Sequence, residues 1–460
     1  MKTTRLRAVA LSITAVALGS ATLAGCGSSN NSDGASASKG SVTISVEGWR
    51  PGDQQATIDY VKQQAAAFHK LHPDITIVPK EWQWNAATFP AQLAGGTLPV
   101  SFRVPFTDTK GLVARHQVAD VDQDIRALPY FDTLNKNVLA AAEGTDGKVY
   151  GLPSDVYANG LHYNRTLFKQ AGLDPDKPPT TWDEVRADAK AIHDKTGQAG
   201  FGEMTKSNTG GWILTTLTYA MGGRVESEDG KTATLDNPGT EQALQMLHDM
   251  RWEDGSISPN NSYDWAGVNQ AFAAGKIGMF VSGSDVYNAL VTTDKINPDD
   301  YGLTAIPLTD SSDAGALGGG SVNVVSAKAS PTEAKAAVEW ADFFRVKKYT
   351  DQDAAVADAK AQTASKQPVG TPTFPIFDQA SYTNYQTWIK DYVNVPLGQM
   401  QGYTDSMFAL KLVAEPAVQT QGVYGALDPV VQKVLSDKGA DIPSLLQQAN
   451  QKAQQIIDQG

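Results

Sequence analysis

Charged and aromatic residues accompany two strands expected near the start of the chain. Val42-Thr43-Ile44-Ser45-Val46 is rich in β-branched residues and predicts a strand that ends in a loop with Trp49 and Arg50. Val100 to Phe106 predicts another strand, and Arg103 to Asp108 lie along it and just beyond it. Such side chains supply fixed hydrogen-bond donors and acceptors and an apolar ring face. Because open parallel sheets bind ligands at the carboxyl ends of their strands, these residues are candidates for a binding site.

Motifs for catalysis or metal binding are absent from the sequence. His69 and His72 share a predicted helix face without a third ligand nearby, which favours a solvated helix end over a metal site. There is no His-Glu-x-x-His or Gly-x-Ser-x-Gly pattern, and Gly318-Gly319-Gly320 lacks the phosphate-binding arrangement. We therefore expect no catalytic residue, metal or cofactor. A secreted glycoside hydrolase remains an alternative, because its paired carboxylates leave no sequence signature. A surface adhesion protein is a second alternative, disfavoured by the absence of repeats.

The start of the chain predicts export. Lys2, Arg5 and Arg7 precede an apolar run too short to span a bilayer, as in a secretory signal peptide. Leu23-Ala24-Gly25-Cys26 follows and resembles the lipobox of bacterial lipoproteins, which implies cleavage after residue 25 and diacylation of Cys26, the single cysteine. An ordinary signal peptide with a chance cysteine is the alternative. Residues 26–40 would then be the lipidated cysteine and a flexible tether, with the protein anchored by lipid outside the membrane.

The charge and length of the remaining chain limit the functions it could have and indicate how many lobes it forms. Loss of residues 1–25 would remove three positive charges and change the net charge from −12 to −15. An acidic chain without basic runs is a poor candidate for binding nucleic acid. No later stretch approaches 18 consecutive apolar residues, so the lipid would be its only membrane contact. The length after the tether exceeds one hydrophobic core and indicates two lobes.

Strands and helices are expected to alternate along the first part of the chain, which argues an α/β lobe with a largely parallel sheet. Thr181 to Thr196 predicts a helix with a Thr181–Glu184 capping box and a stop at Gly197. Trp212 follows two glycines at the start of another predicted helix, so its ring could approach a ligand. Further helices are expected over 54–71, 89–93, 109–116, 209–221, 241–252, 265–274, 331–344, 427–435 and 442–458, and further strands over 74–78, 276–282, 301–307 and 321–326.

Four passages together resemble the extracellular solute-binding proteins, family 1, the maltose-binding-protein-like carbohydrate-binding proteins of ABC importers. The most specific is Ala271 to Phe280 followed by Ser282-Gly283-Ser284. The others are Ala67 to Ile75, Lys148 to Asn164, and Gly318 to Val325 followed by Ser330-Pro331-Thr332-Glu333. Two departures matter. The family usually has Pro-Asp-Val where this chain has Pro99-Val100-Ser101, and several members have Trp near the position of Asp285.

The resemblance implies two α/β lobes joined by crossing segments that close on a ligand. Lobe one would comprise 41–152 and 321–350, and lobe two 153–320 and 351–460. It further implies that the protein captures a sugar or oligosaccharide, acts as a monomer, and delivers its ligand to the membrane permease subunits of an ABC transporter.

The resemblance also implies which side chains line the cleft. A sugar needs planar polar groups for its hydroxyls and aromatic platforms for its C–H faces. Core packing is the alternative for each aromatic residue, and an ion pair is the alternative for each arginine. Trp182, Trp252 and Trp340, on predicted helix faces, are expected in the core. The expected ligand-binding residues are Trp49, Arg50, Arg103, Asp108, Tyr157, Trp212, Asp285, Gly319 and Tyr403.

Overall fold

The computed structural model describes residues 40–53, 55–85, 88–260 and 262–459. The expected signal peptide, Cys26 and nearly all of the tether lie outside these residues. The chain divides into two units, 1–40 and 41–460, and the second contains every helix and strand described. None of the described helices is long and apolar enough to cross a membrane.

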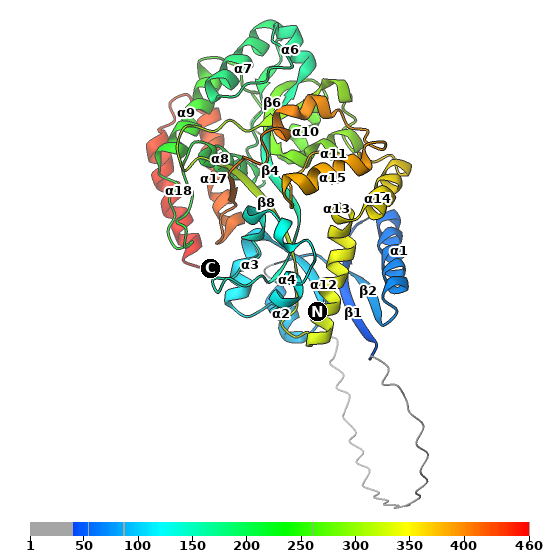
Figure 1. The fold of residues 1–460 in the computed structure, drawn as a ribbon. Helices are drawn as coiled ribbons and strands as arrows, with labels where there is room; N and C mark the ends of the chain where they lie inside the picture. Colours follow the sequence, from blue (N-terminus) through cyan, green and yellow to red (C-terminus); the bar gives the residue numbers. More distant parts are fainter. Residues whose placement is uncertain (1–39, 54, 86–87, 261, 460) are drawn as a thin grey trace, which may run out of the picture. The chain divides into compact units, whose positions relative to one another are not determined.

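A nine-stranded mixed sheet forms the centre of residues 41–460 (Figure 1). Its main path runs β2-β1-β3-β8-β4-β6-β5, with β7 paired to β4 and β9 paired to β8. The β1–β2, β1–β3, β5–β6 and β8–β9 pairs are parallel, whereas β8 and β4 run antiparallel to their other neighbours. The strands are β1 Val42–Trp49, β2 Ile75–Glu81, β3 Ser101–Pro105, β4 Gly151–Asn164, β5 Ala199–Phe201, β6 Ile277–Gly283, β7 Tyr301–Ala305, β8 Ala316–Val325 and β9 Leu412–Ala414.

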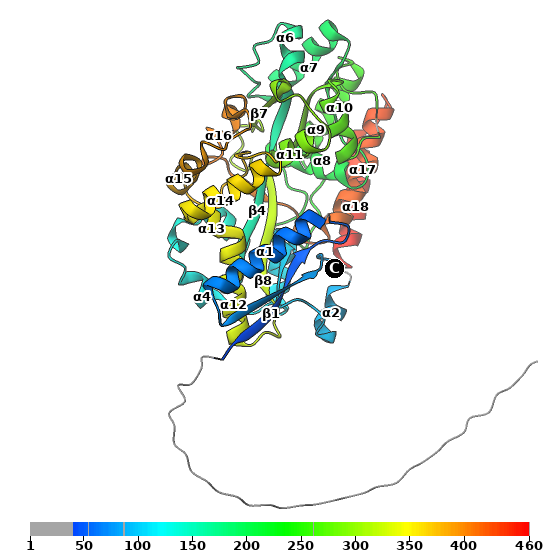
Figure 2. The same ribbon diagram turned by 90° about the vertical axis from the view of Figure 1, so that its right-hand side faces the viewer.

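The strands β4 and β8 connect the two parts of this sheet and run side by side through its centre (Figures 1 and 2). The end of β8 pairs with β3, and the second half of β4 pairs with β6 and β7. Their mutual register shifts between Ser154 and Tyr157, and Asp155 between them has φ +52°. The Asn323 amide donates to the Leu152 carbonyl and to Ser154 Oγ, each at 2.9 Å. The lobe boundaries expected from the resemblance, 152/153 and 320/321, fall inside these two strands.

Helices surround the sheet, and their ends follow local capping chemistry. Thr181 and Glu184 form the expected capping box of α7, and Gly197 ends the helix with φ 70°. A second box joins Ser330 and Glu333 at α12. The helices are α1 Gln55–Leu71, α2 Phe89–Gly95, α3 Phe106–Ala114, α4 Asp122–Arg126, α5 Lys136–Leu139, α6 Arg165–Ala171, α7 Trp182–Thr196, α8 Thr209–Ala220, α9 Pro238–Trp252, α10 Trp265–Ala273, α11 Tyr287–Thr292, α12 Pro331–Ala341, α13 Lys347–Thr350, α14 Gln352–Ala364, α15 Gln379–Ile389, α16 Gln401–Thr404, α17 Thr420–Ser436 and α18 Ile442–Ile457. Short turns are η1 Phe131–Thr133, η2 Ser284–Val286, η3 Pro298–Asp300, η4 Asp342–Val346 (a π turn) and η5 Leu397–Met400.

Most expected elements are confirmed, but several bounds differ. The helix expected over 427–435 begins at Thr420, and the strand expected over 321–326 begins at Ala316. The strand expected to end at Val46 continues to Trp49, because β1 pairs with β2 as far as Glu81. The helix expected from Thr109 begins at Phe106. The sheet is mixed rather than largely parallel, because β8 inserts antiparallel beside β3. No element is expected between residues 351 and 426, yet this stretch contains α14, α15 and β9.

The tryptophans expected in the core are largely inside. Trp182 is 7% exposed and Trp340 is 3% exposed, both within the main hydrophobic core. Trp252 is half-buried, and its indole N–H donates to the Val434 carbonyl at 2.9 Å, which joins α9 to α17.

Candidate functional site

Two of the expected aromatic residues meet beside the crossing strands. Tyr157 lies on β4 and Trp212 lies in the first turn of α8, with ring centroids 6.3 Å apart and planes at 79°. Both side chains are half-buried. This edge-to-face arrangement is a favourable geometry for two aromatic rings. The pair therefore offers a partly accessible, rigid apolar surface where the two parts of the sheet join.

The glycines before Trp212 hold α8 against α17. A Cβ atom at Gly211 would overlap the backbone of Tyr424 on α17. The carboxylate of Asp428 accepts from the backbone amides of Asn208 at 2.7 Å and Gly211 at 2.8 Å. The sequence suggests that Gly210 and Gly211 let a ligand approach the Trp212 ring. In the structure they allow helix packing, and the packing fixes the position of the Trp212 ring.

Gly319 and Glu415 complete this group. Gly319 is the register partner of Tyr157, and a Cβ atom there would lie 2.7 Å from both Tyr157 Oη and Glu415 Oε2. The Tyr424 hydroxyl donates to Glu415 Oε1 at 3.0 Å. Burial raises the pKa of Glu415, and the nearby Asp108 carboxylate raises it further. A carboxyl group is thus held close to the aromatic pair.

Two expected aspartates border the same region. Asp108 lies in the first turn of α3, where Thr107 Oγ1 donates to its Oδ2 at 3.2 Å, and burial raises its pKa. Asp285 lies in η2 beyond β6. A Cβ atom at Gly283 would lie 2.7 Å from Asp285 Oδ1 and 3.3 Å from Tyr157 Cδ2, so Asp285 and Tyr157 flank this glycine. Among the described residues, Asp285 forms no ion pair.

Arg103 is occupied by two carboxylates. Its Nη2 and Nε donate to Glu47 Oε1 at 2.6 and 3.1 Å, its backbone N–H donates to Glu47 Oε2 at 2.7 Å, and its Nη1 donates to Asp155 Oδ2 at 2.8 Å. Although burial opposes it, the Arg345 and Arg103 guanidinium groups lower the pKa of Asp155 to about 2. Arg103 therefore joins β1 to the crossing strand through ion pairs.

The remaining expected residues lie apart from the Tyr157–Trp212 pair. The Trp49 ring faces Lys62 of α1, whose Nζ is 5.5 Å from its centroid. Arg50 is exposed, and its backbone N–H donates to Asp53. Tyr403 is 0% exposed and its ring lies over Gly160 of β4, inside the core. The structure thus gathers Asp108, Tyr157, Trp212, Asp285 and Gly319, with Arg103 next to them.

A cavity of about 740 Å³ lies next to this group and is lined by Asp155 and Asp285. Its other walls come mainly from the segment 365–377 between α14 and α15, from α13, α14 and α15 themselves, and from the π turn before α13. Sequence reasoning identified only Asp285 among its lining residues. The signal that could have indicated the rest is the cluster of aromatic and basic residues from Phe343 to Tyr349. Glu415 was missed as well, because β9, the three-residue strand before it, has no sequence pattern of its own.

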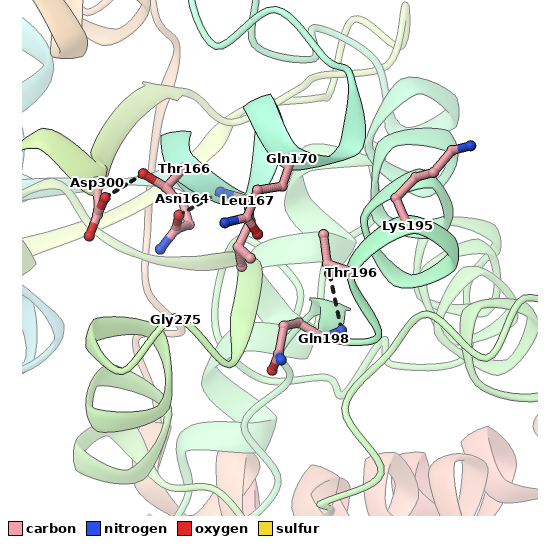
Figure 3. Close-up of a pocket in the computed structure, with 9 residues that line it drawn as sticks. All are labelled: Asn164, Thr166, Leu167, Gln170, Lys195, Thr196, Gln198, Gly275 and Asp300. Atoms are coloured by element: carbon pink, nitrogen blue, oxygen red, sulfur yellow. Dashed lines mark hydrogen bonds between the residues drawn. The ribbon is translucent and has the colours of Figure 1, made fainter.

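A second pocket of about 440 Å³ involves none of the expected site residues (Figure 3). Three hydrogen bonds join its lining residues to one another. Thr166 Oγ1 donates to Asp300 Oδ1 at 2.5 Å, Asn164 accepts from the Leu167 amide at 2.9 Å, and Thr196 Oγ1 accepts from the Gln198 amide at 3.1 Å (Figure 3). This hollow is therefore explained by local helix capping and turn chemistry.

Histidines and acids do not assemble a metal site in the described part of the chain, where no group of three possible ligands comes together. His69 Nδ1 lies 2.7 Å from the Ile75 carbonyl, and His72 Nδ1 lies 3.5 Å from Glu339. These contacts tie α1 to β2 and α12. The two histidines thus have structural partners.

The family match and two curated relatives of this chain are all binding proteins. The family described as bacterial extracellular solute-binding protein matches residues 52–350. A binding protein of Brucella abortus (strain 2308) is 33% identical over 164 residues, which cover 35% of this chain and 38% of the relative. The sn-glycerol-3-phosphate-binding periplasmic protein UgpB of Yersinia pestis bv. Antiqua (strain Antiqua) is 30% identical over 200 residues, 40% of this chain and 45% of the relative. The chain spans less than half the length of these curated relatives.

Solved structures match nearly the whole chain. The cyclic alpha-maltosyl-1,6-maltose binding protein from Arthrobacter globiformis superposes with a TM-score of 0.71 at 21% identity, covering 92% of this chain and 100% of that one. UgpB from Mycobacterium tuberculosis, in complex with glycerophosphocholine, gives a TM-score of 0.68 at 18% identity, covering 91% and 99%. These likenesses show the two-lobed fold of periplasmic binding proteins.

Proposed function

Because the chain belongs to the family of bacterial extracellular solute-binding proteins, we propose that it binds a sugar or a related polyhydroxy compound. It delivers this ligand to the permease subunits of an ABC importer. The observation that carries the proposal is the half-buried Tyr157–Trp212 pair beside the carboxyl groups of Asp108 and Glu415. Sugars present hydroxyl groups and C–H faces, and this arrangement offers a partner for each.

The ligands of similar solved structures support this class. One similar protein binds a cyclic maltosyl-maltose and another was crystallised with glycerophosphocholine. Both ligands are rich in oxygen atoms and carry hydroxyl groups. The proposed role is capture and delivery without catalysis, by a monomer held at the outer face of the membrane through a lipid on Cys26.

Hinged closure completes the proposal. The proposed lobes are 41–152 with 321–350, and 153–320 with 351–460, joined through β4 and β8. Asp155, with φ +52° at the register shift, marks a place where the crossing strand departs from regular geometry. Closure would bring Asp108 of lobe one toward Trp212 of lobe two around the ligand.

A thermal-shift panel of mono- and oligosaccharides tests the function. A ligand that binds only the folded state stabilises it by about 2.7 kcal/mol at 100 times Kd, and the melting temperature rises accordingly. We expect at least one member to do so, and small-angle scattering to show a smaller radius of gyration with that ligand. A panel without any shift, confirmed by calorimetric titration, would contradict sugar binding. Turnover of an oligosaccharide would instead favour a hydrolase.

A further inference from the structure

One guanidinium group in the cavity of about 740 Å³ has no hydrogen-bond partner among the described residues. Arg345 lines this cavity, and among the described residues it forms no hydrogen bond and no ion pair within 4.0 Å. Arg103, by contrast, has two carboxylates as partners. A guanidinium presents five N–H donors, and leaving them unmet in a partly buried place is costly. The described residues thus give Arg345 the electrostatic attraction of Asp155 but no hydrogen-bond acceptor, which leaves its N–H donors free for a ligand.

The neighbouring aromatic residues hold Arg345 in place. Its Cζ lies 4.5 Å from the centroid of the Phe344 ring, and that ring stacks on Trp340 at 4.8 Å and 11°. The residue belongs to the π turn Asp342–Val346, a kind of helix irregularity that is frequent at functional sites. A stacked guanidinium loses less freedom when it binds a planar anion, because its orientation is already set.

A second cation faces the same cavity with an incomplete partner. Lys348 lies three residues further on, and its Nζ is 3.8 Å from Asp358 Oδ2, near the limit for an ion pair. Burial, together with the nearby Arg103 charge, lowers the pKa of Arg345 to about 10. Arg345 thus remains charged at neutral pH. Two cations on one wall give an otherwise acidic protein a local site for negative charge.

The carboxylates that face the cavity leave this site open. Asp155 is close enough to Arg345 for the guanidinium charge to lower its pKa, but its hydrogen bond comes from Arg103 at 2.8 Å. Asp358 Oδ2 accepts from the Gln362 side-chain amide at 2.6 Å. Asp285 lies beyond β6, on a different element from the two cations, and it also borders Tyr157 across Gly283. Asp285 thus connects the cavity with the Tyr157–Trp212 pair.

We propose that the ligand of this protein carries an anionic group, a carboxylate or a phosphate, which Arg345 binds with help from Lys348. The inference rests on the proposed function and specifies its substrate class. The polyhydroxy part of the ligand lies toward Asp285 and the aromatic pair, and the anionic part lies toward the π turn. Charge-assisted hydrogen bonds of this kind are about twice as strong as neutral ones.

Calorimetric titration of the purified protein with matched pairs tests the inference. The pairs are galactose and galacturonate, glucose and glucose 6-phosphate, and glycerol and sn-glycerol 3-phosphate. We expect one anionic member to bind at least about 10-fold more tightly than its neutral partner. Tight binding of galacturonate would identify the anionic group as a carboxylate, and tight binding of one of the two phosphates would identify it as a phosphate. Arg345→Gln should weaken that member about 10- to 100-fold and reduce the preference for charge. Lys348→Gln should have a smaller effect in the same direction.

Arg126→Gln is the matched control, because Arg126 also lies over a phenylalanine ring, with Cζ 5.0 Å from the Phe131 centroid, but is paired with Asp122 outside the cavity. It should bind like the wild type. Tight binding of a neutral sugar, unchanged in Arg345→Gln, would overturn the anionic class while sustaining the proposed function. Tight binding of an anionic member that both Arg345→Gln and Lys348→Gln leave unchanged would overturn the role of this cavity. The absence of any binding in this and the wider panel would overturn both proposals.

Discussion

The ring of Trp212 stands edge-on to the ring of Tyr157, at 6.3 Å between centroids and 79° between planes. One ring belongs to a helix that is anchored on Asp428, and the other belongs to a strand that crosses between the two parts of the sheet. Their meeting point is thus sensitive both to helix packing and to the geometry of the crossing.

Trp212 and Trp182 should separate binding from folding. Trp212→Ala removes a half-buried ring from the proposed sugar platform and should cost about 1–3 kcal/mol of binding, roughly 5- to 150-fold in Kd. Trp182 is 7% exposed in the core, so Trp182→Ala should cost about 3–5 kcal/mol of folding. Titration and a melting curve on both variants measure this. If Trp212→Ala binds normally and melts far lower, Trp212 is a core residue.

Gly319→Ala should weaken ligand binding although it replaces no polar side chain. The added Cβ atom would lie 2.7 Å from Tyr157 Oη and Glu415 Oε2, so both side chains must move. Gly398→Ala is the matched control, because no atom lies within 4 Å of the Cβ position there. Calorimetric titration should show a loss of affinity for Gly319→Ala alone. Equal affinity in the two variants would place Tyr157 and Glu415 outside the ligand site.

Loss of Arg103 should destabilise the fold because the buried carboxylate of Glu47 would lose its ion-pair partner. The side chain of Glu47 is 6% exposed and that of Arg103 is 16% exposed. Arg103→Met should lower the free energy of unfolding by about 3–5 kcal/mol, measured with urea. Adding Glu47→Gln should recover part of this loss. The exposed pair of Arg126 and Asp122 serves as control, and Arg126→Met should cost at most about 1 kcal/mol. Similar losses for the two arginines would argue against a buried pair.

Glu415→Gln should change the pH dependence of stability. Burial raises the pKa of Glu415 in the folded state, so the folded protein retains this proton at a pH where the unfolded chain has released it. The stabilising contribution is complete below the ordinary glutamate pKa of about 4.3 and is lost as the pH rises through the raised value. The glutamine variant should therefore be the more stable protein at pH 7 and should lose this advantage near pH 4. Chemical unfolding at both pH values measures the difference, and parallel curves would contradict it.

Cys26→Ala should abolish anchoring in the native host. The lipobox resemblance predicts a diacylated cysteine, and two acyl chains suffice for stable membrane residence. Metabolic labelling with a fatty acid should mark the wild type alone. Equal label in the variant would exclude Cys26 as the lipidation site.

Sequence reasoning succeeded where local chemistry decides the structure. The Thr181–Glu184 capping box and the apolar period of α7 predict that helix residue by residue. Gly319 and Tyr157 are different, because their pairing depends on strands far apart in the chain. The resemblance selected both as site residues, but their contact with Glu415 could not be anticipated. β9, which precedes Glu415, has three residues and is defined only by its pairing with β8.

Arg345 shows a second limit. The apolar period predicts a helix ending at Phe344, and an exposed basic residue after a helix end is the ordinary expectation. The helix instead continues as a π turn, and the changed rotation places Arg345 on the cavity. Such turns depend on tertiary packing, here the Trp340–Phe344 stack, and leave no periodic signal.

The place of β8 in the sheet has a consequence for biogenesis. Ser101 of β3 pairs with Val325, and Gly151 of β4 pairs with Val324, so the first part of the sheet stays incomplete until residue 325 is available. Until then the open side of β3 is an unpaired edge that could join to other chains. Closing such long loops before contact energy is gained slows folding. Nascent chains that stop short of Ala316 should therefore remain aggregation-prone, and completion of β8 is the step that commits the chain to its native topology.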